Sequence, residues 1–152
     1  MPSSNSNPSA RGWLGRVAAL SAVILLMLLG LTLHYSHPRL RAERYVEDHL
    51  ETLTADAQAA LAGEALRYDA AILTANVWPG RDSYGPMAEY LLTTDWGRYY
   101  GFYYAPDGPH PFQNVPQPLT RSGEGWRWQG EGDNEGYTAP IAGDWYYFEA
   151  RL

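Results

Sequence analysis

The sequence contains no cysteine and no lysine, since all 11 of its basic residues are arginine. The lack of cysteine excludes disulfide bonds, thiolate nucleophiles and cysteine-ligated metals, and the lack of lysine excludes Schiff-base chemistry. With 152 residues, the chain is long enough for one small domain but too short for two full hydrophobic cores. Any chemistry that the protein performs must therefore use other side chains. We expect those side chains to be carried by one small domain with a single hydrophobic core.

Charge is distributed unevenly along the chain. Residues 1 to 44 contain five arginines and one acidic residue, a formal charge of +4, whereas residues 45 to 152 contain six arginines and sixteen acidic residues, a formal charge of −10. A surface that acidic repels phosphate backbones, because nucleic-acid affinity comes largely from arginine and lysine. We therefore expect no nucleic-acid partner.

One long uncharged run stands near the N-terminus. Residues 17 to 33 contain no charged side chain, and Trp13 and Tyr35 lie just beyond its ends. As a helix this run spans about 26 Å, and aromatic rings prefer the two membrane interfaces. The pattern predicts a transmembrane helix over 13–35, with Trp13 and Tyr35 at the interfaces. It is uncleaved, because no small-residue cleavage site follows the run.

The residues around this run set the predicted topology. The tail over 1–12 is polar and rich in serine and proline, so we expect it to be disordered. Arg11 and Arg16 precede the run in a stretch without acidic residues, which favours a cytoplasmic N-terminus. The sequence thus predicts a single-pass membrane protein with an extracytoplasmic C-terminal domain.

A helical period follows over residues 36–78. An apolar stripe at steps of three and four residues predicts an amphipathic helix, Gly63 predicts a break, and the period then resumes as far as Val77. This face packs either on the chain's own sheet or on a partner helix. The stripe before the break consists of Val46, Leu50, Leu53, Ala57 and Ala60.

The remaining segment, 79–152, is rich in aromatic residues, glycine and proline, a composition typical of short strands and turns. We expect a small antiparallel sheet, closed by a C-terminal strand over 144–151, with further strands over 98–104 and 126–129 and a turn over 105–108. A short helix is predicted over 86–92, and the glycine-rich stretch around 131–136 is predicted to be a loop. The predicted fold class is α+β.

Aromatic residues are predicted on both faces of these strands, because side chains alternate along a strand. Either one face is core and the other is packed beneath another element, or one face is an exposed patch that binds a partner protein, a sugar ring or the membrane interface. Gly101 leaves a gap that suggests close packing by another element. The candidate contact residues are Tyr99, Tyr100, Phe102, Tyr103, Tyr104, Trp126, Trp128, Trp145 and Tyr147.

No pattern of catalytic residues emerges from the sequence. Ser83 and Ser122 are not in a nucleophile elbow, and His110 is flanked by two prolines. The acidic stretch over 131–136 does not have the spacing of a calcium-binding EF-hand loop. The spacing of the acidic residues does not exclude a catalytic pair of carboxylates. We predict a protein that is not an enzyme and that has no cofactor or metal site.

The overall layout is similar to that of one known family. Arg11-Gly12-Trp13 resembles the basic-glycine-aromatic processing site of type IV pilins and pseudopilins, and an apolar helix, an amphipathic helix and an antiparallel sheet follow it, as in that family. The chain departs from the family by having Arg16 within the apolar run and Val17 at the position of its glutamate. The resemblance implies a component of a membrane-associated assembly.

The expected function is that of a membrane-anchored accessory or interaction subunit of an envelope or membrane-protein complex. Its expected partners are the lipid bilayer and another membrane or envelope protein. Three alternatives stay open: an anchored module that binds carbohydrate or peptidoglycan, a pilin-like assembly component, and an anchored hydrolase that uses paired carboxylates.

Overall fold

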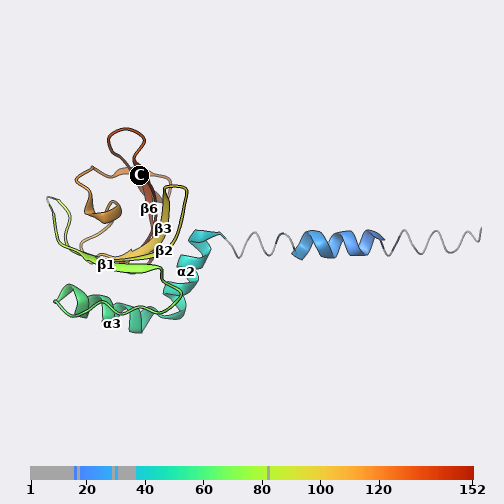
Figure 1. Ribbon diagram of the computed structural model, residues 1–152, viewed down its shortest axis with the longest axis horizontal. Coiled ribbons are helices and arrows are strands. Elements are labelled where there is room, and N and C mark those ends of the chain that lie inside the picture. Colours follow the sequence, from blue (N-terminus) through green and yellow to red (C-terminus); the bar gives the residue numbers. More distant parts are fainter. Residues whose placement is uncertain (1–15, 17, 29, 31–36, 82) are drawn as a thin grey trace, which may run out of the picture. The chain divides into compact units, whose positions relative to one another are not determined.

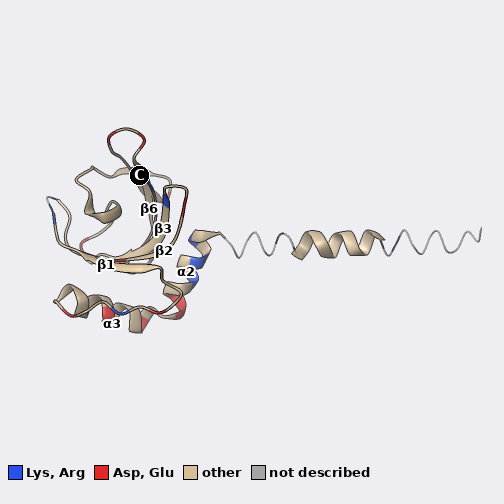
Figure 2. Ribbon diagram, viewed as in Figure 1, with Lys and Arg blue, Asp and Glu red and all other residues tan. Residues whose placement is uncertain are grey.

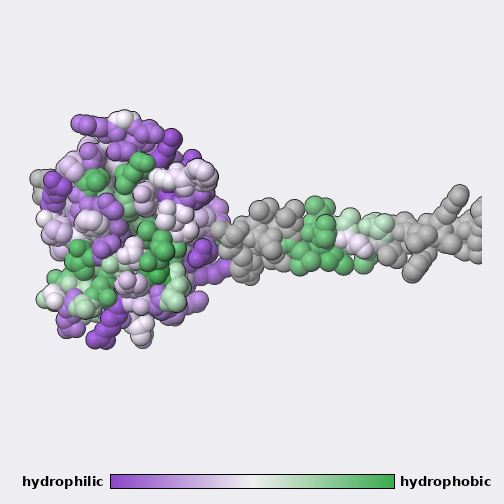
Figure 3. Space-filling view, in the orientation of Figure 1, coloured by the Kyte–Doolittle hydropathy of each residue, from purple (hydrophilic) through white to green (hydrophobic). Residues whose placement is uncertain are grey.

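The structure is a computed structural model that describes residues 16, 18–28, 30, 37–81 and 83–152. It divides into two compact units, Met1–His37 and Pro38–Leu152. In the first unit residues 18–28 are helical, and Figure 3 shows them as hydrophobic surface.

The predicted transmembrane helix over 13–35, and with it the single-pass membrane localisation, is wrong. Among the helices that the structure describes, none is both long and apolar enough to span a bilayer. The predicted interface residues Trp13 and Tyr35, and the predicted tail, lie outside the described residues.

Two helices open the second unit, α2 (Pro38–Asp48) and α3 (Leu50–Leu61), with His49 between them. Most of the predicted stripe is buried, and Leu50 is the exposed exception. Gly63 adopts φ +105° just after α3, as the predicted break requires. The resumed helical period is not realised, because residues 74–78 form a strand instead.

All the strands of the second unit belong to one antiparallel sheet. The C-terminal strand β7 lies in the middle of this sheet, between β3 and β6, rather than closing it as we expected. The strands are β1 (Thr74–Trp78), β2 (Met87–Asp95), β3 (Arg98–Tyr104), β4 (Thr120–Ser122), β5 (Gly125–Gln129), β6 (Glu135–Ala142) and β7 (Trp145–Arg151), in the spatial order β1-β2-β3-β7-β6-β5-β4. The fold class is α+β, as expected.

The sheet curves around an inner loop, residues 105–119, which contains the short 3₁₀ helix η1 (Phe112–Asn114); α2 and α3 lie outside the curve (Figure 1). Two hydrophobic cores result, one on each face. The outer core, beneath the helices, includes Ala42, Val46, Tyr90, Phe102 and Trp145. The inner core, around the loop, includes Met87, Tyr103, Phe112, Trp128 and Phe148.

Two errors in the predicted elements arise where tertiary structure overrides the local pattern. The run Met87 to Tyr90 is buried at four consecutive positions, so β2 lacks the alternation of a one-sided strand, and we assigned its first residues to a helix. The stretch around 131–136 contains the start of β6, which pairs with β5 and β7 despite its polar residues. Tertiary pairing overrides local composition in both places.

Gly101 is the point of closest approach on β3. A Cβ atom there would overlap the carbonyl oxygen of Tyr90 and the ring of Phe148. The close packing that the sequence suggested at Gly101 is therefore present, and the ring of Phe148 on β7 fills the space.

We expect alanine substitution to destabilise both faces of β3 alike. Phe102→Ala in the outer core and Tyr103→Ala in the inner core should each lower the free energy of unfolding by about 3 to 5 kcal/mol, because both side chains are fully buried. Urea denaturation measures this, with Tyr68→Ala as an exposed control. A loss confined to one of the two variants would contradict a sheet buried on both sides.

Candidate interaction surface

The structure buries most of the aromatic residues proposed from the sequence as contact residues. Tyr99, Tyr100 and Trp126 are half-buried, whereas the other six are buried. Some of their rings contact one another: the ring centroid of Trp145 lies 5.8 Å from that of Phe102 and 5.2 Å from that of Tyr104. The six buried side chains are Phe102, Tyr103, Tyr104, Trp128, Trp145 and Tyr147.

Trp126 borders a groove of about 470 Å³ beside the proline-rich part of the inner loop. The guanidinium of Arg121 lies 4.4 Å from the centre of its ring and covers one face, while Tyr146 meets the ring edge-on. A sugar ring stacks on an open aromatic face, so the face that Arg121 covers is not available for stacking. Of the three half-buried rings, Trp126 is thus already engaged within the fold.

The most exposed large hydrophobic side chain among the described residues is one that the sequence analysis did not select. Trp96 is 98% exposed and lies between β2 and β3. Asp95 pairs with Arg98, so Trp96 and Gly97 form a two-residue hairpin turn, and both have positive φ, 45° and 78°. Such turns favour Asn-Gly, because a side chain in the left-handed region is strained. A fully exposed tryptophan in this position therefore has neither packing nor backbone preference to explain it.

A sequence signal for Trp96 was present. The dipeptide Trp96-Gly97 stands between two aromatic, strand-like runs, where a hairpin turn is expected. Our assignment of 86–92 to a helix hid the first strand of that hairpin, and the turn with it.

A second exposed hydrophobic residue is hydrogen-bonded to this turn through its backbone. The amide of Leu152 donates a hydrogen bond of 3.1 Å to the carbonyl oxygen of Gly97, and Leu152 is 46% exposed. Trp96, Gly97 and Leu152 together are called the hairpin tip below.

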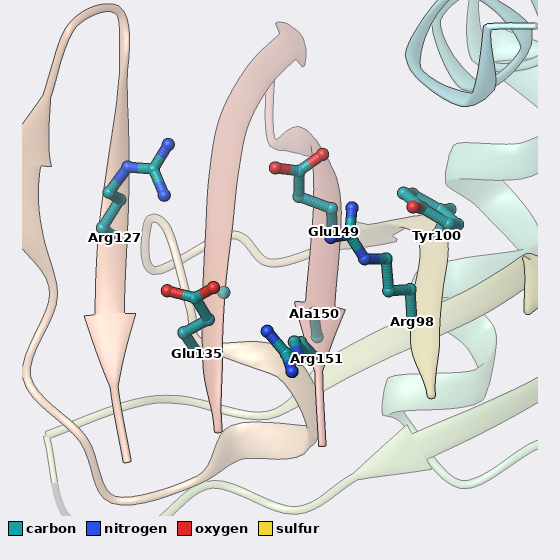
Figure 4. Close-up of a pocket in the computed structure, with 8 residues that line it drawn as sticks. Arg98, Tyr100, Arg127, Glu135, Glu149, Ala150 and Arg151 are labelled. Atoms are coloured by element: carbon teal, nitrogen blue, oxygen red, sulfur yellow. The ribbon is translucent and has the colours of Figure 1, made fainter. Parts of the chain in front are cut away.

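Next to the hairpin tip, a pocket of about 80 Å³ opens on the outer face of the sheet (Figure 4). Two rows of cross-strand neighbours build it. Tyr100 and Tyr137 each pair with Glu149, and Arg98 and Glu135 each pair with Arg151. We call it the charged pocket; its lining side chains are Arg98, Tyr100, Arg127, Glu135, Glu149 and Arg151, over the backbone of Gly136 and Ala150.

The charged pocket combines both signs of charge. Arg151 forms an ion pair of 2.9 Å with Asp133, and the hydroxyl of Tyr147 donates a 3.3 Å hydrogen bond to Glu149. Hydrogen bonding to Tyr100, together with the charges of Glu149 and Glu135, raises the pKa of Arg98. Half of the six arginines of residues 45 to 152 line this one pocket. The pocket therefore presents cations within a strongly acidic domain.

Helix α2 packs on the same three strands that carry most of the charged pocket. The helix packs against β3, β6 and β7, and its Arg39 forms ion pairs with Glu43 and with Glu124 at the β4–β5 turn. Around the charged pocket the side chains of the outer face change from aromatic to charged.

A buried carboxylate holds the inner loop against the sheet on the opposite face. Glu89 on β2 is 3% exposed and accepts hydrogen bonds from the indole of Trp78, at 3.1 Å, and from the backbone amide of Gln113, at 3.0 Å. Burial raises the pKa of Glu89 to about 7, although both hydrogen bonds lower it. Gln113 has φ 54°, so this bond fixes a left-handed residue of the loop.

Further buried polar groups complete this attachment. The side-chain amide of Asn114 donates hydrogen bonds of 2.9 Å to the carbonyl oxygens of Pro79 and Gly85. The Tyr103 hydroxyl accepts a 2.8 Å bond from the His110 amide and lies 2.7 Å from the Thr138 hydroxyl. Burial lowers the pKa of His110, which favours its neutral form. These groups fasten loops to the sheet, and the described residues contain no cluster of metal-ligating side chains.

No protein-family model matches the chain, and neither the curated proteins nor the solved structures include a significant match. The pilin-like processing residues Arg11, Gly12 and Trp13 lie outside the described residues.

We expect Glu89 to make stability depend on pH. Its pKa is about 7 in the folded state and 4.5 ordinarily, so the folded state holds a proton that the unfolded state releases. The stability from this group is complete below pH 4.5 and falls by about 3 kcal/mol as pH rises to 7 and above. His110 acts in the opposite direction, since its lowered pKa destabilises the folded state at acid pH.

Comparison of the wild type with Glu89→Gln isolates this contribution, because His110 is common to both. Urea denaturation across this pH range should show the wild type losing stability relative to the variant as pH rises. Parallel pH profiles would contradict a buried carboxyl group with a raised pKa.

Proposed function

We propose that this chain is a protein-interaction module whose contact surface is the hairpin tip together with the charged pocket. The observation that carries the proposal is Trp96, 98% exposed and held with positive φ where a small polar residue is favoured. Strain combined with exposure of a large hydrophobic side chain is typical of a functional residue.

The composition of this surface supports the proposal. Tryptophan and arginine are enriched among the residues that contribute most to binding between proteins, and such residues lie within a surround of weaker polar contacts. Here the exposed Trp96 lies two residues before Arg98, and Arg98 lines the charged pocket together with Arg127 and Arg151 (Figure 4). A matching partner has a hydrophobic pocket for the indole and charges of both signs around it.

The charge of the module supports a basic partner surface. Residues 45 to 152 have a formal charge of −10, which attracts cationic proteins over a distance and speeds their encounter. The carboxylates Glu135 and Glu149 in the charged pocket then contact the partner's cations, and the arginines exclude partners that lack matching acids. This function involves no catalytic step.

The Trp96→Asn variant separates function from stability. Asparagine suits a turn residue with positive φ, so unfolding free energy should rise by about 1 kcal/mol. Binding should be lost, because the indole anchor is gone. A photo-crosslinking amino acid at Thr94, near the turn, in the full chain in its native cells should trap a defined partner, and Trp96→Asn should abolish that product.

Two controls accompany this experiment. The same crosslinker at Tyr68, which is 52% exposed on another part of the domain, should not give the product. Salt should weaken crosslinking at Thr94, since charges contribute to the contact. An unchanged product in Trp96→Asn, or the same product from Tyr68, would contradict the proposed surface.

A further inference from the structure

The first strand of the sheet has one unpaired side. In the described part of the chain β1 pairs with β2, and it occupies one end of the strand order (Figure 1). A strand at a sheet edge presents backbone N–H and C=O groups that another strand can bind. The opposite edge is β4, which is three residues long and includes Arg121.

The β1 edge lacks the features that keep edge strands apart. Proteins protect exposed edges with charged residues, proline or bulges. Thr74–Trp78 contains no charge and no proline, and residues 70–80 contain no charged residue at all. Figure 2 shows β1 entirely in tan, the colour of uncharged residues, whereas α3 carries acidic residues in red. Hydrophobic side chains are exposed here, with Leu73 at 58% and Val77 at 39%.

We propose that two copies of this chain pair through antiparallel β1 strands to form one continuous sheet. An antiparallel pair of identical strands has a twofold axis, so a single edge complements itself. Pairing over the whole strand places Asn76 opposite its symmetry mate and brings Val77 of one copy against Ala75 of the other. The exposed hydrophobic side chains of the strand are then covered.

Self-complementarity favours a second copy as the occupant, and charge selects this uncharged edge as its position. Two domains that each have a formal charge of −10 over residues 45 to 152 repel one another, and close approach is least unfavourable where neither carries charge. The uncharged stretch 70–80 meets that condition. Added salt should therefore strengthen this pairing by screening the repulsion, whereas it weakens contacts made by the charged pocket.

Sedimentation of the full chain over a range of concentrations tests the pairing. Val77→Lys places a charge on each edge and should shift the protein toward monomer, with a tenfold or greater loss of self-association. Leu50→Lys is the matched control, since Leu50 is also 39% exposed but lies on α3; it should leave self-association unchanged. Equal self-association of Val77→Lys and the wild type would overturn the proposal, as would an equal loss in both variants.

A disulfide test does not depend on Val77. Because the chain has no cysteine, Asn76→Cys introduces one thiol, and paired strands bring opposed Cα atoms to a separation compatible with a disulfide. Mild oxidation should give a covalent dimer, and Glu131→Cys in the β5–β6 loop should not. Lack of a dimer from Asn76→Cys, or equal yields from both, would overturn the proposal. Trp96→Asn should leave this dimer unchanged, so the two proposals fail separately.

Discussion

The aromatic residues on both faces of one sheet are the constraint from which the rest of the domain follows. Phe102 and Tyr103 are consecutive on β3, point to opposite faces, and are both fully buried. Large rings on two faces need two covering layers. The helices α2 and α3 cover the outer face, and the curved sheet encloses its own loop on the inner face (Figure 1).

Enclosing a loop requires partners for its polar groups. Residues 105–119 carry backbone donors into a hydrophobic surrounding, where an unpaired donor is destabilising. Glu89, Asn114 and Tyr103 supply the pairing, and each connects the loop to a strand or to a neighbouring loop. The carboxyl group of Glu89 must lie beneath the loop, away from water, to accept the bond from the loop. This burial raises its pKa.

Sequence patterns predicted the parts of the fold that depend on local periodicity. The buried stripe of α2 and α3 follows from side-chain spacing. The break follows from the glycine at position 63, and the strand over 98–104 follows from its aromatic composition. The strand β1 and the start of β2 were missed because their identity depends on pairing with each other, which no local period reveals. Most of the aromatic residues proposed as contacts are buried, because aromatic side chains form the core of this domain. The fully exposed Trp96 became recognisable only with the hairpin. The apolar N-terminal run led to a membrane-spanning helix that the described residues do not contain.

Solvent access to individual indoles tests this account most directly. In full-length protein labelled with 5-fluorotryptophan, each fluorine resonance shifts between H₂O and D₂O in proportion to its exposure, and single Trp→Phe variants assign the resonances. The account predicts a full shift for Trp96, which is 98% exposed, and almost none for Trp128 and Trp145, which are 4% and 1% exposed. A shielded Trp96, or a solvent-exposed Trp145, would contradict a domain that buries both faces of its sheet and leaves one tryptophan outside.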